Sequence, residues 1–171
     1  FMVPLGLNQA VTGRVGLAHG AGNPEGVSRA GWTAFVIGVS FMALMGLVMV
    51  LWPHLLISAF IDLANPANAR VIALAVSFLV FAALFQVFDG AQAVAAGMLR
   101  GLHDTKVPMI YAAIGYWGIG LPLGVLLACP FGFHGVGIWI GLSSGLAVVA
   151  ALLLARWLRR DRLAPPLAFG H

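Results

Sequence analysis

An all-α bundle of about five membrane-spanning helices is the fold class that this sequence predicts. Of its 171 residues, 61% are hydrophobic and 8% are charged, and the mean hydropathy is +1.01. Soluble domains contain about 25% charged residues. The apolar residues also come in separate runs that reach the ~20 residues needed to cross the hydrocarbon core of a bilayer. These observations disfavour a soluble helical domain and predict a polytopic membrane protein.

The first two helices are expected over residues 1–18 and 30–53. Arg14 lies near the end of the first helix, where its side chain can reach the membrane surface. The glycine-rich stretch His19–Gly26 matches no phosphate-binding motif, so it is interpreted as a tight connection. Residues 54–69 mix apolar and polar side chains, and they predict a short helix or turn at the membrane surface.

The third helix, over residues 70–99, carries the strongest functional signal. Asp89 lies between Gln86 and Gln92 in an otherwise apolar run. The three-residue spacing places all three on one helix face, with Phe85 beside them. A charged side chain in hydrocarbon costs on the order of 3 kcal/mol by insertion scales. This face is therefore expected to meet protein or a water-filled cavity, which Phe85, Gln86 and Gln92 would line.

No basic residue of the chain is placed to neutralise Asp89. At 1.5 Å per residue, Asp89 lies about 28 Å from Arg70 and about 16 Å from Arg100 along the helix. Its charge must then be met by a bound cation or a proton, unless another helix supplies a partner. We expect Asp89 to bind a coupling ion, either sodium or a proton. The alternative is an aspartate that is permanently hydrogen-bonded within a helix interface.

The last two helices are expected over residues 109–129 and 136–158. Pro122 lies inside the first of them and removes a backbone hydrogen bond, which predicts a kink. The kink is either a moving part or a static packing feature. The second helix has three small residues at four-residue spacing, a pattern typical of close helix packing. These residues are Gly137, Gly141 and Gly145.

The distribution of charge predicts the topology. If five helices alternate in direction, eight of the nine basic residues fall on one side of the membrane and Arg70 falls on the other. The positive-inside rule then places the C-terminus and the loop that contains His103 in the cytoplasm. Residues 1–158 are interpreted as part of one transmembrane lobe, and 159–171 as a cytoplasmic tail. Because no initiator methionine opens the chain, we expect it to be the C-terminal part of a longer protein.

Little in the sequence points to enzymatic or metal chemistry. Cys129 is the single cysteine, which excludes an internal disulfide and a multi-cysteine metal site. His103 and Asp104 are interpreted as part of a solvated loop, because no nucleophile of matching geometry accompanies them. The basic residues form no contiguous stripe for nucleic acid. The chain is therefore predicted to be neither an enzyme nor a nucleic-acid-binding protein, with no structural metal and no cofactor.

Several short motifs occur in a fixed order along the chain. They are Pro4-Leu-Gly6, Phe85-Gln-Val-Phe-Asp-Gly-Ala-Gln92, Gly97-Met-Leu-Arg-Gly101, Gly120-Leu-Pro-Leu-Gly124 and Gly135-Val-Gly-Ile-Trp-Ile-Gly-Leu142. This series, with its spacing, resembles the C-terminal lobe of a bacterial multidrug and toxin extrusion (MATE) transporter of the NorM-like kind.

The resemblance implies the last part of a twelve-helix protein with two six-helix lobes, located in the bacterial inner (plasma) membrane. It also implies export of cationic or amphiphilic drugs in exchange for sodium ions or protons. The implied partners are the lipid bilayer, the missing N-terminal lobe and the drug. Asp89 matches the acidic residue that this family associates with cation coupling, whereas Phe85 stands where some relatives have a tyrosine.

Two alternative functions are retained. A lipid-linked precursor flippase of the same superfamily would be expected to have a more basic cavity, whereas the buried charge predicted here is acidic. A structural membrane subunit without transport activity predicts that neutralising Asp89 is harmless. An integral membrane enzyme would need a cluster such as paired His and Glu or a Ser–Lys dyad at membrane depth, and the sequence has none.

Overall fold

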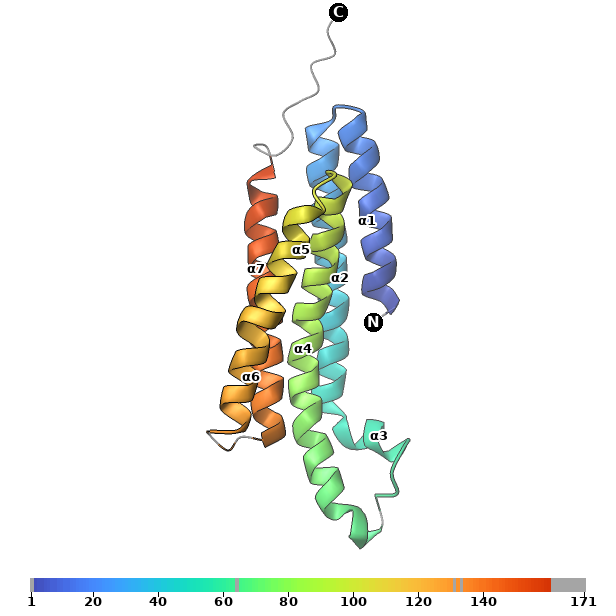
Figure 1. Ribbon diagram of the computed structural model, residues 1–171. Coiled ribbons are helices and arrows are strands. Elements are labelled where there is room, and N and C mark those ends of the chain that lie inside the picture. Colours follow the sequence, from blue (N-terminus) through green and yellow to red (C-terminus); the bar gives the residue numbers. More distant parts are fainter. Residues whose placement is uncertain (1, 64, 131, 133, 161–171) are drawn as a thin grey trace, which may run out of the picture.

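The computed structural model describes residues 2–63, 65–130, 132 and 134–160, and within these residues the chain forms helices and no β-strand. The elements are α1 (Met2–Gly20), α2 (Pro24–Leu51), α3 (Pro53–Ser58), η1 (Pro66–Asn68), α4 (Ala69–Gly101), α5 (Lys106–Ala113), η2 (Ile114–Gly120), α6 (Leu121–Ala128) and α7 (His134–Leu158). The predicted all-α class is therefore confirmed (Figure 1).

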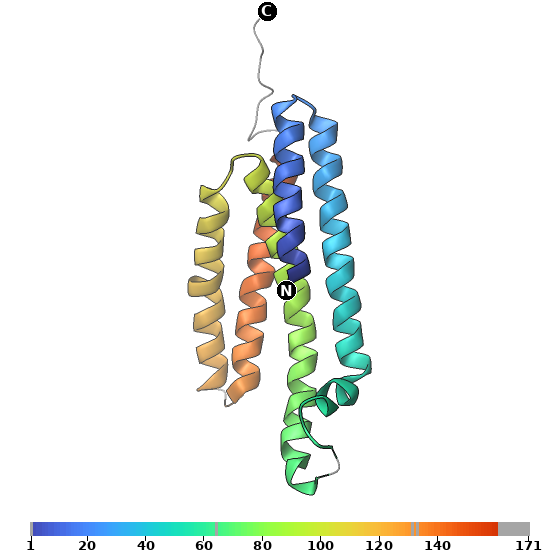
Figure 2. The same ribbon diagram turned by 90° about the vertical axis from the view of Figure 1, so that its right-hand side faces the viewer.

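The long helix α4 is the central element of the bundle. Figure 2 shows α1 in front of the upper part of α4, α2 on one side of α4, and the continuous α5–η2–α6 rod with α7 on the other side. Helix α4 packs directly against α1, α2 and α7, while α6 packs against α7. The bundle thus consists of two helical hairpins that are joined through one shared helix.

The connection between α1 and α2 is shorter than the sequence predicts. Helix α1 ends at Gly20 and α2 begins at Pro24, before the predicted start at residue 30. Asn23 caps the new helix, because its Oδ1 accepts a hydrogen bond from the Gly26 N–H at 2.8 Å. Proline at the first helical position favours the same start. The predicted loop over His19–Gly26 is therefore wrong in its bounds.

The surface segment that the sequence predicts before α4 is present. Figure 1 shows the chain turning away from the bundle after α2, through α3, before it enters α4. Pro53 and Pro66 start the short helices α3 and η1. The Asn65 Oδ1 accepts a hydrogen bond from the Ala67 N–H at 3.0 Å, which fixes the turn into η1. Each helix is too short to cross a membrane.

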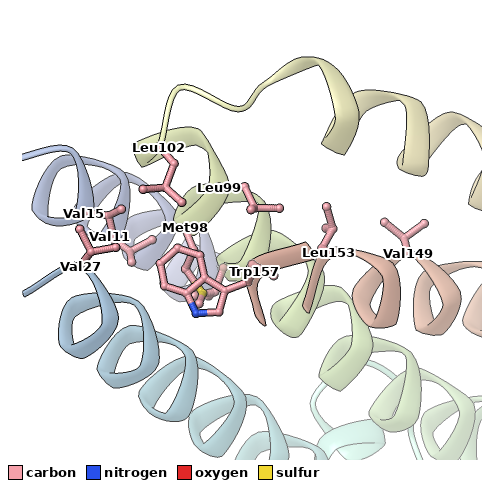
Figure 3. Close-up of a cluster of buried hydrophobic side chains, with 11 residues drawn as sticks. Val11, Val15, Val27, Met98, Leu99, Leu102, Val149, Leu153 and Trp157 are labelled. Carbon is pink, nitrogen blue, oxygen red and sulfur yellow. The ribbon is translucent and has the colours of Figure 1, made fainter. Parts of the chain in front are cut away.

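One apolar core joins four helices at the end of the bundle where α4 and α7 finish (Figure 3). Trp157 of α7 is fully buried there, and a side chain at Gly31 of α2 would collide with its ring. Because lipid tails are as apolar as these side chains, close packing stabilises this core more than water exclusion does. The labelled residues are Val11, Val15, Val27, Met98, Leu99, Leu102, Val149, Leu153 and Trp157.

The predicted fourth helix has an irregular middle. Segments α5, η2 and α6 follow one another without a break, and η2 is π-helical. Pro122 lies directly after it, in the first turn of α6. Prolines and single π-helical turns are common causes of a bend within a membrane helix, because neighbouring hydrogen bonds shift to new partners. The irregularity predicted at Pro122 thus begins before the proline.

Four helical stretches are long and apolar enough to cross a membrane, and they match four of the five predicted spans. They are Pro24–Leu51, Pro66–Gly101, Lys106–Ala128 and Gly135–Leu158. Helix α1 is not among them, although it packs along α2 and α4. The expectation that residues 1–18 also belong to a span stays a prediction. Residues 161–171 of the predicted tail lie outside the described residues.

Candidate functional site

Asp89 lies half-buried in α4, beside the buried residues Gly90 and Ala91. Gly90 allows α2 to come close, because a Cβ at this position would lie 2.7 Å from the Met42 Cγ. Among the residues that the structure describes, Asp89 forms no hydrogen bond and no ion pair. The carboxylate therefore has no fixed counter-charge in this part of the chain.

The two glutamines near Asp89 contact different neighbours. Gln86 Nε2 donates a hydrogen bond to the Met42 carbonyl oxygen of α2 at 3.2 Å. Gln92 Oε1 accepts one from the Tyr116 hydroxyl of η2 at 2.7 Å. Each three-residue step falls about 60° short of a full turn, so the two glutamines lie about 120° apart around the helix. The prediction that Gln86, Asp89 and Gln92 share one helix face is therefore too simple. Asp89 lies between the interface of α4 with α2 and the interface of α4 with η2.

Tyr116 is a polar neighbour of Asp89 that the sequence analysis did not assign to the site. It is half-buried, and its hydroxyl donates a hydrogen bond to Gln92, which lies three residues after Asp89 in α4. The preceding residue, Gly115, has no room for a side chain, since a Cβ there would collide with Val149 of α7. This close packing holds η2 against α7 while the Tyr116 hydroxyl reaches α4. The available signal in the sequence was a tyrosine in the middle of an apolar span.

Phe85, which precedes Asp89 by about one turn of α4, contributes an aromatic contact. Its ring meets Trp139 of α7 edge to face, with ring centroids 5.6 Å apart. Trp139 also lines an apolar pocket of about 500 Å³, together with residues of α2, α3 and α4 such as Phe78. Phe85 carries no oxygen, whereas Tyr116 of η2 has a hydroxyl that hydrogen-bonds to Gln92.

A smaller cavity, of about 280 Å³, begins at Gln92 and extends between α4 and α5. Arg100, Asp104 and Thr105 line it near the connection between these helices. Polar side chains thus border the cavity both at the Gln92–Tyr116 hydrogen bond and near the end of the bundle. Such a space is polar enough to hold water.

Asp104 is not the solvated residue that the sequence suggests. Its side chain is 13% exposed, and Oδ2 accepts a hydrogen bond from Arg156 Nε in an ion pair with α7. Arg100 is also paired, since its Nη1 donates to the Asn8 Oδ1 of α1 at 3.1 Å. These contacts tie the α4–α5 connection to α7, and the end of α4 to α1. The interpretation of Asp104 as part of a solvated loop is wrong.

The glycine strip of α7 contacts backbone rather than side chains. A Cβ at Gly141 would collide with Gly124 of α6, and one at Gly137 would lie 2.7 Å from the Ala128 nitrogen. A Cβ at Gly145 would lie 2.7 Å from the Gly115 oxygen of η2. The strip therefore acts in packing and brings no chemistry to the site.

The residues that could hold a cation are few. The described part of the chain contains no group of three or more His, Cys, Asp or Glu side chains arranged to bind a metal. One candidate set combines the Asp89 carboxylate with the oxygens of Gln92, three residues later in α4, and Tyr116 of η2. Hard cations such as sodium prefer oxygen ligands of this kind, in the manner of calcium and magnesium.

Comparison with known proteins decides the family. Residues 1–126 match the MatE family. The chain belongs to the MatE family. Over its full 171 residues, this MatE chain is 96% identical to a probable multidrug resistance protein NorM of Mesorhizobium japonicum, of which it covers 37%. It is 59% identical to a protein of the same description from Brucella suis, over 93% of the chain and 34% of that protein.

A solved structure agrees with this assignment. The MatE chain is similar to the crystal structure of the eukaryotic MATE transporter AtDTX14, with a TM-score of 0.78 and 28% sequence identity. The similarity covers 94% of the chain and 36% of that structure. The chain thus spans about a third of the length of these relatives. The family and the apolar helices identify it as a multi-pass membrane protein, and the resemblance noted from the motifs is confirmed.

Proposed function

We propose that this chain is part of a secondary active transporter that exports cationic or amphiphilic drugs in exchange for sodium ions or protons. Its relatives are described as multidrug resistance proteins and as a MATE transporter. In the proposed mechanism, the part of the protein outside this chain supplies the opposing lobe. The two lobes then rock about a site near the bilayer midplane, as in other transporters built from two repeats.

The observation that carries the proposal is the state of Asp89. It is an acidic side chain within a membrane helix, half-buried and without a partner among the described residues. An ionisable group in such a place is costly to keep unless it binds something. A sodium ion or a proton would neutralise it, and the oxygens of Gln92 and Tyr116, which share a hydrogen bond, would complete the site.

The proposed orientation in a bacterial inner membrane rests on the distribution of the basic residues. Seven of the eight described Lys and Arg residues lie toward one end of the bundle. This end contains the α1–α2 connection, the α4–α5 connection and the end of α7. Arg70 alone lies at the opposite end, at the start of α4. The positive-inside rule assigns the basic end and the C-terminus to the cytoplasm. The cavity that begins at Gln92 then leads toward the cytoplasm, where the coupling ion would leave.

The test is Asp89→Asn in the full-length protein, reconstituted into vesicles with an imposed sodium or proton gradient. Coupled efflux of a cationic dye should fall about a hundredfold, because a charged pair between ligand and protein contributes roughly 2–5 kcal/mol. Applying each gradient alone identifies the coupling ion. Asp62→Asn is the matched control, since this carboxylate is exposed at the other end of the bundle. Undiminished coupled efflux by Asp89→Asn at equal protein levels would falsify the proposal.

A further inference from the structure

An open groove with a cavity volume of about 600 Å³ lies between α1 and α2. It is separate from Asp89 and from the cavity at Gln92, which no residue of the groove lines. Two arginines line it, Arg14 of α1 and Arg29 of α2. The remaining lining is mostly apolar and includes Leu7, Ala34 and Ile37.

The two arginines lie at the same height on the hairpin. Helices α1 and α2 are antiparallel and are joined by the turn 21–23. At 1.5 Å per residue, Arg14 and Arg29 each lie about 11 Å from this turn along their own helix. Leu7 and Ile37 lie about 11 Å farther along the same two helices. The groove therefore has two cationic side chains at one level and an apolar floor that extends from them toward the middle of the bundle.

Neither arginine has a partner within the part of the chain that the structure describes. Both are exposed and form no hydrogen bond or ion pair there. This distinguishes them from Arg100, Arg156 and Arg160, whose guanidinium groups bind Asn8, Asp104 and Ser28. Glu25 lies one turn nearer the loop than Arg29 but does not line the groove.

We propose that this groove binds one anionic phospholipid of the cytoplasmic leaflet. The phosphate would lie between the Arg14 and Arg29 guanidinium groups, which present several N–H donors to phosphate oxygens. One acyl chain would lie along the apolar floor past Ala34 to Leu7 and Ile37. Basic pockets between helices on the cytoplasmic side of a membrane are suited to anionic headgroups. The proposal depends on the charge-based orientation and not on the transport activity.

Native mass spectrometry of the full-length protein, purified in detergent and titrated with phosphatidylglycerol, tests the proposal. One phosphatidylglycerol should be retained in preference to phosphatidylcholine. The double variant Arg14→Gln/Arg29→Gln should bind phosphatidylglycerol about thirtyfold more weakly, since each basic residue near a membrane surface contributes about 1 kcal/mol. Arg159→Gln is the matched control, because it removes a charge from the same end of the bundle without touching the groove.

A second variant tests the floor of the groove while leaving both arginines in place. Ala34→Phe should fill the space for the acyl chain and reduce retention of phosphatidylglycerol. Inorganic phosphate at matched concentration should not displace the lipid, because it has no chain to bury.

Equal retention of the two lipids, or unchanged retention in the double variant, would overturn the proposal. So would protection of the Thr33→Cys variant from a lipid-soluble maleimide in delipidated protein that also carries Cys129→Ser, since protein would then cover the groove.

Discussion

Asp89 and Asp104 are two carboxylates close together in sequence, one within α4 and one just after it. Their surroundings differ, because only Asp104 has an ion-pair partner among the described residues. Asp104 is nearly buried and is paired with Arg156 of α7. Asp89 lies deeper in a membrane helix and has no partner among the residues described. A carboxylate with a fixed counter-charge can hold two helices together but cannot readily exchange ions. A carboxylate without one is available to a mobile cation.

The surroundings of the two residues reinforce this difference. The Asp104 ion pair adjoins the apolar core around Leu153 and Trp157, where packing is close. Asp89 instead lies between the Gln86 contact with α2 and the Gln92 contact with η2. The first carboxylate therefore joins two helices at the end of the bundle that holds the apolar core. The second lies where two helix interfaces meet.

The largest expected effect comes from giving Asp89 the fixed partner that Asp104 already has. Gln92→Arg places a guanidinium group three residues away on the same helix, within reach of the carboxylate. Coupled dye efflux should fall about a hundredfold, because the arginine would compete with the coupling ion at short range. The measurement is efflux from vesicles under an imposed gradient. Gln92→Leu is the control for the added charge, since it removes the Gln92 oxygen and its Tyr116 hydrogen bond without adding a guanidinium group, and it should reduce coupled efflux far less than Gln92→Arg does.

The converse change removes the partner of Asp104. Arg156→Gln should lower the free energy of unfolding by about 2 kcal/mol, between the values for exposed and fully buried ion pairs. Denaturation in mixed detergent micelles measures this loss. Adding Asp104→Asn to the same protein should recover part of the stability, because no unpaired charge is then left. Arg159→Gln should change stability by less than about 0.5 kcal/mol; a loss equal to that of Arg156→Gln would argue against the ion pair as the cause.

The smallest effect concerns the phenol beside Asp89. Tyr116→Phe removes one hydroxyl that donates to Gln92 at 2.7 Å. A single hydrogen bond of this kind contributes about 1 kcal/mol, so the apparent affinity for the coupling ion should fall about fivefold. Efflux measured over a series of ion concentrations tests this expectation, with the maximal rate nearly unchanged. Tyr111→Phe is the matched control, and an equal shift in both variants would show that the effect is not local to Asp89.

Much of the architecture could be predicted from composition and spacing, because a membrane imposes long apolar helices. Four of the five expected spans are matched by stretches suited to crossing, and the surface segment before α4 is present. The predicted start of α2 at residue 30 is too late, because Asn23 and Pro24 start the helix before it. The cap at Asn23 outweighs the glycines that follow it.

The sequence is enough to single out Asp89 as a candidate site residue, but it does not predict which residues contact its neighbours. Asp89 stands out because an acidic residue in an apolar run is costly unless it is hydrogen-bonded, paired or bound to a cation. The partners of Gln86 and Gln92 could not be read from spacing, since they depend on which helices pack on either side of α4. The same holds for Asp104, whose partner Arg156 lies far away in sequence. Tertiary contacts of this kind leave no periodic trace in the chain.

The glycine strip between α6 and α7 has a mechanical consequence. Backbone atoms of the two helices meet directly at Gly124 and Gly141, with no side chain between them that could change its rotamer. A thicker or thinner bilayer cannot alter their spacing without opening a void that neither lipid nor water would fill. Hydrophobic mismatch would therefore be accommodated by tilting α6 and α7 together or by a local change in bilayer thickness, and not by sliding one helix away from the other.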